Sequence, residues 1–191
     1  MQDITVRDRE GVYPVSEDTH LLAESVEVHP GETVLEIGCG TGYVSLFLAA
    51  QGAVVTGVDI NPLAVALARE NARESGLEAT FIESDLFAGV DGTYDVIVCN
   101  PPYLPSEDIE KTPYDACWDG GPTGREFSAR FIAAMPSYLS PRGRAYLLQS
   151  SLCSPDASVG ELVAAGFSVT VAGTRALFFE RLFVFCARRS G

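Results

Sequence analysis

The sequence predicts an α/β fold in which helices cover both faces of a mostly parallel sheet. Strand-like and helix-like runs alternate through most of the 191 residues, a pattern typical of parallel strands joined by crossover helices. The last two strand-like runs, residues 167–172 and 181–187, leave no room for a helix between them, so an antiparallel hairpin is expected to close the sheet. The length fits one domain over residues 1–191, in which residues 1–30 would form an N-terminal helix and lid segment.

Each element has its own local signal. Short apolar runs rich in β-branched residues predict seven strands, over residues 33–37, 53–58, 79–83, 94–99, 144–149, 167–172 and 181–187. Helices are predicted over residues 43–50, 62–75, 124–139 and 156–165, after an N-terminal helix that ends near Val26 and that Ser16 or Asp18 would cap. The helix over 62–75 has the clearest ends, because Asn61 can cap it, Pro62 fits its first turn and Gly76 can stop it. Residues 103–123 are polar and rich in Pro and Gly, which predicts an insertion.

Composition excludes several classes of protein. Acidic residues outnumber basic ones by 26 to 13, and the formal net charge is −13. A field of that sign repels phosphates, so direct nucleic-acid binding is not expected. The sequence has no run of about 18 apolar residues and no cationic leader segment, so we expect a cytoplasmic protein with no membrane attachment. The five cysteines include no C-x-x-C pair, so we expect no metal site and a reducing compartment.

The basic residues are unusual in kind. Arginine accounts for all of the 13 except Lys111. Few lysines and a strong acidic excess are expected of a surface adapted to high salt, as in a halophilic archaeon. A GC-rich coding bias explains the same composition, and the sequence leaves both explanations open.

Candidate ligand-binding residues follow the predicted parallel strands, because such sheets bind ligands outside the carboxyl ends of their strands. Gly38, Gly40 and Gly42 follow the first strand and let the backbone approach a ligand closely, beside a helix N-terminus that favours an anion. Their G-x-G-x-G spacing differs from the G-x-G-x-x-G of nicotinamide sites. Asp59, at the end of the second strand, could accept hydrogen bonds from both hydroxyls of a ribose. A tight glycine turn without a ligand and a helix-capping Asp59 are the alternatives.

Two further strand ends complete the candidate site. Asp85 could accept from the amine of an adenine while Leu86 covers the ring, although an aspartate in a loop is often only solvated. The tetrapeptide Asn100-Pro101-Pro102-Tyr103 is more specific, because its two prolines remove backbone donors and leave carbonyls free to accept. Together with the Asn100 side chain it could hold a planar –NH₂ group by both protons, and Tyr103 could stack on the flat group beside it.

Taken together, these residues resemble the class I, S-adenosylmethionine-dependent methyltransferases. The tetrapeptide resembles that of the amino-methylating branch. Four stretches, residues 12–19, 35–42, 100–105 and 118–126, are similar to those of the HemK-type protein-glutamine methyltransferases of archaea and eukaryotes. The resemblance implies a Rossmann-like seven-stranded sheet and S-adenosyl-L-methionine as the cofactor. It also implies catalysis by Asn100, Pro101, Pro102 and Tyr103, and cofactor contacts from Tyr13, Glu17, Thr19, Glu36, Gly38, Gly40, Gly42, Asp59, Ile60, Asp85, Leu86 and Asn100.

The resemblance also implies a substrate and a partner. The substrate would be the glutamine of the Gly-Gly-Gln motif in a class I translation release factor. The partner would be a small zinc-binding activator protein that forms a heterodimer with the methyltransferase. The third predicted strand should lie at a sheet edge, where an apolar strand invites pairing, so we expect the partner to add there near Phe81 and Ile82. A charged residue at either position should then abolish co-purification.

Two other functions remain open from the sequence. The same tetrapeptide serves enzymes that methylate exocyclic amines of adenine or guanine in DNA or RNA, although the charge of −13 argues against such substrates. A non-catalytic methyltransferase-like scaffold is a second alternative, against which the intact tetrapeptide and the acidic residues at 59 and 85 argue.

Overall fold

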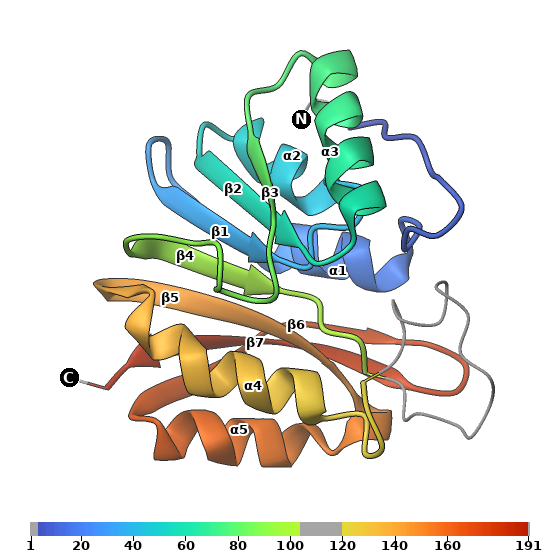
Figure 1. The fold of residues 1–191 in the computed structure, drawn as a ribbon. Coiled ribbons are helices and arrows are strands. Elements are labelled where there is room, and N and C mark those ends of the chain that lie inside the picture. Colours follow the sequence, from blue (N-terminus) through green and yellow to red (C-terminus); the bar gives the residue numbers. More distant parts are fainter. Residues whose placement is uncertain (1–3, 104–119, 191) are drawn as a thin grey trace.

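A computed structural model describes residues 4–103 and 120–190 of the chain. Its helices are α1 (Glu17–Ser25), α2 (Tyr43–Ala49), α3 (Pro62–Ser75), α4 (Glu126–Ala134) and α5 (Pro155–Ala164), with short 3₁₀ turns at Met135–Ser137 and Ser151–Cys153. Its strands are β1 (Thr33–Ile37), β2 (Val54–Asp59), β3 (Thr80–Glu83), β4 (Tyr94–Cys99), β5 (Leu139–Ser150), β6 (Phe167–Ala176) and β7 (Arg181–Arg189). The seven strands form one sheet in the order β3-β2-β1-β4-β5-β7-β6 (Figure 1).

The sheet confirms the predicted fold class. Strands β1 to β5 run parallel to one another, and β7 pairs antiparallel with both β5 and β6. The register places Ile37 of β1 opposite Val58 of β2 and Cys99 of β4. Because chain order reverses between β1 and β4, the loops after β1, β2 and β4 meet at the switch point where ligands of such sheets bind.

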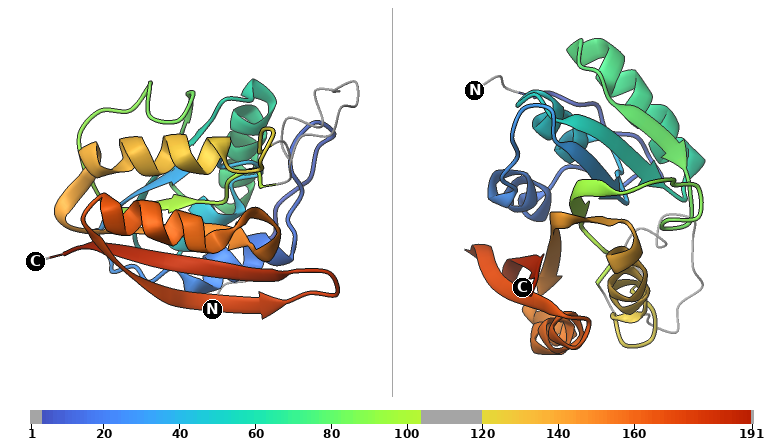
Figure 2. Two further views of the ribbon diagram at one scale, coloured as in Figure 1. Left: turned by 90° about the horizontal axis from the view of Figure 1, so that it is seen from below. Right: turned by 90° about the vertical axis from the view of Figure 1, so that its left-hand side faces the viewer.

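Two helical layers enclose the sheet, and the alternation of strand side chains decides which layer each residue meets. Leu35, Ile97 and Leu147 belong to a core cluster with residues of α4 and α5. Their chain neighbours, such as Val34 and Tyr146, belong to a second cluster with residues of α1 and α2. Figure 2 shows these two layers on opposite sides of the twisted sheet. The continuous apolar runs of the central strands therefore reflect burial on both faces.

The predicted strands and helices all form, most of them with bounds within one or two residues of the prediction, but three elements differ by more. The predicted helix over 124–139 ends as α4 at Ala134 and continues as a 3₁₀ turn that contains Pro136. Strand β5 begins at Leu139, five residues before the predicted start at Arg144, because Leu139 pairs with Tyr94 of β4 across an irregular register. The final hairpin is longer than predicted, since β6 and β7 remain paired as far as Ala176 and Arg181. Most of the predicted insertion, residues 104–119, lies outside the described residues.

Strand β3 is an edge strand, as predicted, but its side chains are not free. Phe81 is only 2% exposed and packs with Cys39, Leu46 and Ala68 under α3. Ile82 is partly buried against the core on the other face of the sheet. The proposed charged substitution at Phe81 would therefore disrupt the core, and its effect on co-purification would not report on the edge alone.

The backbone of the β3 edge is also partly covered. The Arg69 guanidinium, reaching from α3, donates from Nε and Nη2 to the Phe81 carbonyl at 3.2 and 2.5 Å. Ser84 N donates to Asp59 O of β2 at 2.9 Å. Because successive residues of a parallel strand hydrogen-bond to opposite sides, the Phe81 backbone faces away from β2, toward the open edge.

Among the described residues, no helix is both long enough and apolar enough to cross a membrane.

Candidate active site

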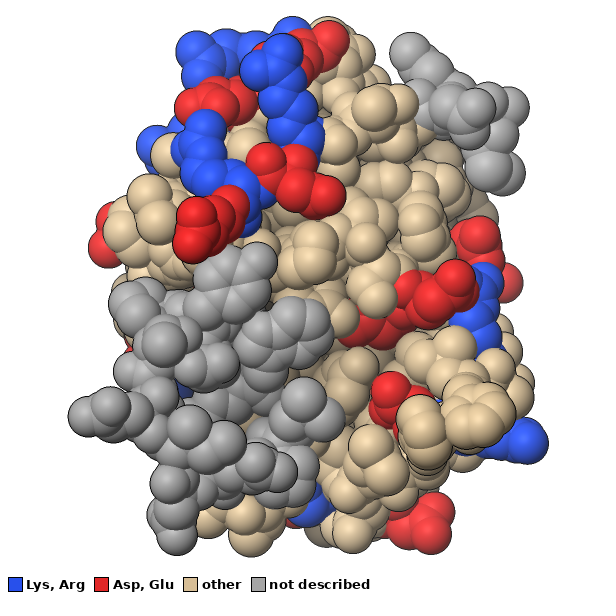
Figure 3. Space-filling model, turned by 90° about the vertical axis from the view of Figure 1, so that its right-hand side faces the viewer, with Lys and Arg blue, Asp and Glu red and all other residues tan. Residues whose placement is uncertain are grey.

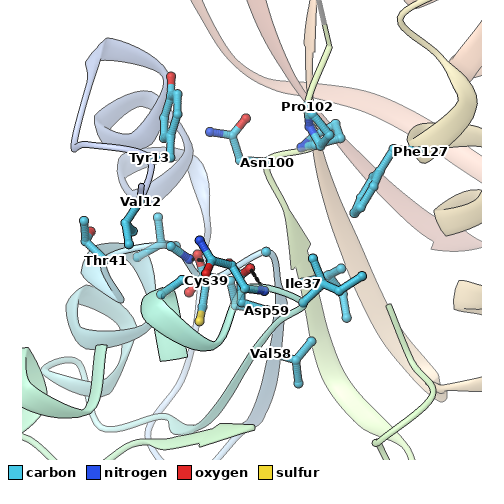
Figure 4. A pocket seen from close by; sticks show the side chains of 18 of the residues that line it. Val12, Tyr13, Ile37, Cys39, Thr41, Val58, Asp59, Asn100, Pro102 and Phe127 are labelled. Carbon is cyan, nitrogen blue, oxygen red and sulfur yellow. Dashed lines mark hydrogen bonds between the residues drawn. The ribbon is translucent and has the colours of Figure 1, made fainter. Parts of the chain in front are cut away.

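A cavity of about 480 Å³ opens at the switch point, where the loops after β1, β2, β3 and β4 meet. Its volume lies within the range of small-molecule sites. In Figure 4, Tyr13, Asn100 and Pro102 follow one side of this cavity, Phe127 of α4 lies near Pro102, and Asp59 lies below Asn100. Most of the predicted site residues line the cavity: Tyr13, Thr19, Glu36, Gly38, Gly40, Asp59, Ile60, Asp85, Leu86, Asn100, Pro101, Pro102 and Tyr103.

Two predicted cofactor residues do not line it. The Glu17 carboxylate lies on the exposed side of α1 and pairs with Arg175 of β6. Gly42 is the N-cap of α2 and faces inward, where an added Cβ would lie 2.9 Å from Ala68 Cβ. Gly42 therefore shapes the loop by close packing, while Glu17 belongs to an exposed ion pair.

The glycine loop, residues 38–42 after β1, is fixed by its backbone conformation and by hydrogen bonding to Asp59. Gly38 and Gly40 have φ values of +77° and +51°, which L side chains rarely adopt. The Asp59 carboxylate accepts a hydrogen bond from Gly40 N at 2.9 Å through Oδ2 and another from Asn61 N at 2.9 Å through Oδ1. Asp59 thus ties the loop after β1 to the start of α3, and both of its oxygens retain lone pairs for a ligand.

Glu36 lies at the base of the cavity and is 3% exposed. Its Oε2 accepts hydrogen bonds from the backbone N–H and the hydroxyl of Ser45. Burial is the main reason that the pKa of Glu36 rises to about 8, and the nearby Asp59 carboxylate adds to the rise. Burial also raises the pKa of Asp59, against three backbone hydrogen bonds that lower it. The base of the cavity is therefore a site where cationic or hydrogen-bond-donating groups are favoured.

The loop after β3 places Asp85 and Leu86 at the cavity wall. Leu86 is buried and has φ +50°, a left-handed backbone conformation that residues other than glycine adopt mainly in tight turns. The Asp85 carboxylate forms an ion pair with Arg130 of α4, with Oδ2 at 2.8 Å from Nη2. Both partners are about half exposed, so this pair is weak and its carboxylate can exchange partners.

The tetrapeptide after β4 is anchored from two directions. Asn100 Nδ2 donates to Asp18 Oδ2 of α1 at 3.1 Å. Cys153 Sγ donates to the Tyr103 carbonyl at 3.0 Å. The buried Asn100 Oδ1 has no hydrogen-bond partner among the residues that the structure describes. A buried acceptor without a partner is costly, and Asn100 also lines the cavity, so its side chain is a candidate for binding a donor from a ligand.

Sequence reasoning missed three residues that shape this site. Asp18 is 2% exposed and accepts from Tyr13 Oη at 2.6 Å as well as from Asn100, yet the sequence suggested it only as a helix cap. Ser16 is the N-cap of α1 instead. Phe127 and Arg130 line the cavity from α4. No sequence pattern marked them as site residues, because only the fold brings α4 beside the loop after β3.

Within the described parts of the chain, no cluster of His, Cys, Asp or Glu is arranged to hold a metal ion.

Comparison with known proteins identifies the family. The family model described as the methyltransferase small domain matches residues 3–154. A protein of Methanocaldococcus jannaschii, provisionally named a protein N5-glutamine methyltransferase, is 43% identical over 181 residues, which are 93% of this chain and 92% of its own length. The human protein named Methyltransferase HEMK2 is 34% identical over 187 residues, which cover 91% of this chain and 87% of that protein.

A solved structure agrees with both sequence comparisons. The E. cuniculi Mtq2-Trm112 complex, described as responsible for methylation of the eRF1 translation termination factor, matches with a TM-score of 0.78 at 25% identity. The match covers 94% of this chain and 99% of the matched chain. The chain therefore belongs to the methyltransferase small-domain family, and the cavity beside Asn100 is its candidate active site.

Proposed function

We propose that the protein transfers a methyl group from S-adenosyl-L-methionine to the N5 atom of a glutamine, in the Gly-Gly-Gln motif of a class I translation release factor. The observation that carries this proposal is that Asn100 lines the cavity while its buried Oδ1 has no hydrogen-bond partner among the described residues. Asn100 Oδ1 and the carbonyl of Pro101, the next residue in the chain, are two acceptors on residues that line the cavity, and a primary amide offers two N–H donors in one plane. The names of the relatives support glutamine as the acceptor and a termination factor as its carrier.

The residues present fit the cofactor. Gly38 and Gly40 leave space for a ligand against the backbone, and Asp59 keeps lone pairs free for ribose hydroxyls. Leu86 offers an apolar surface for a base, with the Asp85 carboxylate beside it. Tyr13 and Thr19 would cover the cofactor from the N-terminal segment. When bound, the cofactor supplies a methyl group on a sulfonium, which is already an electrophile and needs no further activation.

The chain's own residues would position the acceptor. A glutamine amide nitrogen is a weak nucleophile because its lone pair is delocalised into the carbonyl. Asn100 Oδ1 and the Pro101 carbonyl would each accept one N–H, which holds the nitrogen toward the cofactor and stabilises the positive charge that develops on its protons during transfer. As the N–C bond forms and the sulfonium S–C bond breaks, one of these two protons must leave the nitrogen, and it would be released to solvent. Tyr103 would pack on the amide plane and exclude water. The pKa of the Tyr103 hydroxyl is raised by burial and by the Asp18 carboxylate, so this side chain stays neutral.

The test follows radiolabelled methyl groups into acceptors. Tritiated S-adenosyl-L-methionine is incubated in high-salt buffer with the host release factor, with a copy in which the Gly-Gly-Gln glutamine is changed to alanine, and with total RNA. Each acceptor is tested with and without a candidate zinc-binding partner. Label that enters only the intact factor supports the proposal. Label in the altered factor assigns another residue, and label in RNA assigns the alternative, an exocyclic base amine.

The surface argues against that alternative. On the face where the carboxyl ends of the parallel strands meet, the Arg side chains of the described residues gather mainly at one end, where they lie among Asp and Glu (Figure 3). Elsewhere the described part of this face is mostly uncharged or acidic. Two arginines near α3, Arg7 and Arg9, are already paired with Glu74 and Glu70. A nucleic acid would find little uncompensated positive charge near the cavity on the part of the chain that the structure describes.

We also propose that a small zinc-binding activator pairs with this chain at the β3 edge. The matched Mtq2 structure is a complex with a second protein, Trm112. Beside the β3 edge lies a groove lined by Val54, Ala79 and Thr80, and Val54 is 61% exposed. An added strand would take over the Phe81 carbonyl from Arg69, because both would occupy the same backbone acceptor.

Exposed positions test this interface without disturbing the core. Val54→Asp places a charge in the groove, and we expect it to reduce co-purification of the partner. Val171→Asp is a matched control, since Val171 is 56% exposed on β6, the opposite edge strand. If both variants co-purify with the partner as well as wild type does, the interface lies elsewhere. If both lose the partner to the same extent, the loss is a general effect of added charge.

A further inference from the structure

Asp18 links the N-terminal segment to the tetrapeptide after β4. Its Oδ2 accepts from Tyr13 Oη at 2.6 Å and from Asn100 Nδ2 at 3.1 Å. Its Oδ1 accepts from Thr19 N at 2.6 Å and from Thr19 Oγ1 at 3.2 Å. The side chain is buried, and each of its carboxylate oxygens has two donors, so its geometry is fixed by four hydrogen bonds.

The chemistry of a carboxylate decides which way the Asn100 amide points. Both carboxylate oxygens are already acceptors here, so the atom of Asn100 that faces them must be the donor, Nδ2. The reversed amide would set Oδ1 against the Asp18 oxygens and would lose the hydrogen bond. With Nδ2 committed to Asp18, Oδ1 is the amide atom left for a ligand: Asn100 lines the cavity, and its Oδ1 has no partner among the described residues.

An acceptor oriented in this way is what the proposed reaction needs. If Nδ2 faced the cavity, it would repel the N–H groups of an acceptor amide and bind the amide oxygen instead. The acceptor nitrogen would then point away from the methyl donor, and a small misplacement of that kind is costly for transfer. Asn100 directly follows β4, and the hydrogen bond from its Nδ2 to Asp18 is the contact among the described residues that settles this choice.

We propose that Asp18 is a positioning residue for methyl transfer, which acts by holding the Asn100 amide with its oxygen toward the acceptor. This inference rests on the proposed function, because it assigns Asn100 Oδ1 to an acceptor N–H. Since Tyr13 lines the cofactor cavity and binds the same carboxylate, Asp18 also connects the covering segment to the orientation of Asn100.

A double-mutant cycle tests the inference. The variants are Asp18→Asn, Asn100→Ala and their combination, each assayed as the complex with the partner, under single-turnover conditions with enzyme in excess. Asp18→Asn preserves shape but lets the new amide donate to Asn100 Oδ1, so we expect the transfer rate to fall about 100-fold. In the Asn100→Ala background the same change should cost less than about threefold, because the side chain that Asp18 positions is already gone.

A purely structural role would not give this pattern. If Asp18→Asn lowers the rate equally in both backgrounds, Asp18 acts independently of Asn100 and the inference is wrong. Normal transfer by Asp18→Asn would also overturn it. Calorimetry of cofactor binding and a melting curve of each variant separate loss of transfer from loss of the cofactor site or of the fold.

A reciprocal swap keeps the test decisive if Asp18→Asn alone folds poorly. In the variant Asp18→Asn with Asn100→Asp, the new amide can donate to the new carboxylate, whose second oxygen again faces the cavity as an acceptor. We expect this swap to transfer methyl groups faster than Asn100→Asp alone, in which two carboxylates face each other. A swap no faster than that single variant contradicts the inference.

The identity of the acceptor that the wild-type complex labels tests the proposed substrate separately from the positioning role of Asp18. Label in RNA in place of the release factor would reject the proposed substrate, and the same cycle would then be run on RNA. Coupling between Asp18 and Asn100 on that acceptor would support the positioning role even though the substrate proposal had failed.

Discussion

Asp59 at the end of β2 binds Gly40 in the loop after β1, with 2.9 Å between Asp59 Oδ2 and Gly40 N. The two residues are 19 positions apart, yet this hydrogen bond fixes the part of the glycine loop that lines the cavity. The same carboxylate accepts from Asn61 N, so it aligns the loop and the start of α3 together. One side chain therefore shapes the wall of the candidate site and keeps acceptor lone pairs beside it.

Replacing Asp59 should weaken cofactor binding for both reasons. We expect Asp59→Ala to reduce affinity for S-adenosyl-L-methionine by about 10- to 100-fold, since hydrogen bonds to a charged group contribute about 1.5–3 kcal/mol each. Isothermal titration calorimetry measures the change. Asp91→Ala removes an exposed carboxylate outside the cavity and serves as the control. Equal affinity of Asp59→Ala and wild type would remove Asp59 from the cofactor site.

Asn100 should matter to transfer more than to cofactor binding. Asn100→Ala removes the acceptor Oδ1 and leaves the glycine loop and Asp59 intact, so we expect kcat to fall about 100-fold or more. The dissociation constant for the cofactor should change little in comparison. Stopped assays with labelled cofactor give kcat, and calorimetry gives the affinity. Near-normal turnover by Asn100→Ala would contradict the role proposed for its side-chain oxygen.

Local signals predicted the sheet well and the site in part. The strand over 94–99 and the helix over 62–75 have the predicted bounds, because caps, glycine and apolar runs act within a few residues. Asp18 could not be assigned from sequence, since its partner Asn100 is 82 residues away and nothing local distinguishes a buried carboxylate from a cap. The burial of Phe81 was missed for a similar reason, because a strand pattern does not reveal which face a helix covers.

Phe81 also explains why β2 contains Gly57. A Cβ at position 57 would lie 2.8 Å from Phe81 Cδ1 and 2.9 Å from Cys39 Cβ. We expect Gly57→Ala to lower the free energy of unfolding by about 1–3 kcal/mol, the usual cost of overpacking a core. Gly160→Ala is the matched control, because a Cβ on that α5 residue meets nothing within 4 Å.

In the control, alanine should raise the free energy of unfolding by about 0.5–1 kcal/mol through helix propensity. Urea denaturation of the three proteins measures both effects. If Gly57→Ala is as stable as wild type, the packing between β2 and β3 is looser than these distances indicate.

The charge of −13 leads to a prediction about salt. The Debye length falls from about 8 Å at 0.15 M to about 3 Å at 1 M, so repulsion between surface carboxylates is largely screened by 1 M. If the surface is adapted to high salt, Tm should rise from 0.1 M to 1 M KCl and continue to rise beyond it. A melting curve at several KCl concentrations measures this, with sucrose as a non-ionic control. A flat Tm would leave the coding bias as the explanation for the rarity of lysine.

The raised pKa of Glu36 predicts how the free energy of unfolding depends on pH in the absence of cofactor. Burial raises the pKa of this carboxyl from about 4.5 to about 8 in the folded state, so between these values the folded chain holds a proton that the unfolded chain releases. The folded state binds more protons in this window. Stability from Glu36 is therefore fully present below pH 4.5 and is lost as pH rises toward 8. The loss cannot exceed about 1.4 kcal/mol per pH unit for one group.

Glu36→Gln isolates this effect. Glutamine keeps an oxygen that can accept from Ser45 but does not titrate, so the variant should lose less free energy of unfolding than wild type as pH rises. Asp59, whose pKa is also raised, is present in both proteins, so the comparison reports on Glu36 together with its interaction with Asp59. Urea denaturation at pH 5.0, 6.5 and 8.0 should show the variant gaining on wild type with each step. A constant difference between the two proteins would mean that Glu36 is ionised across the whole range, and that the base of the cavity is more polar than its burial implies.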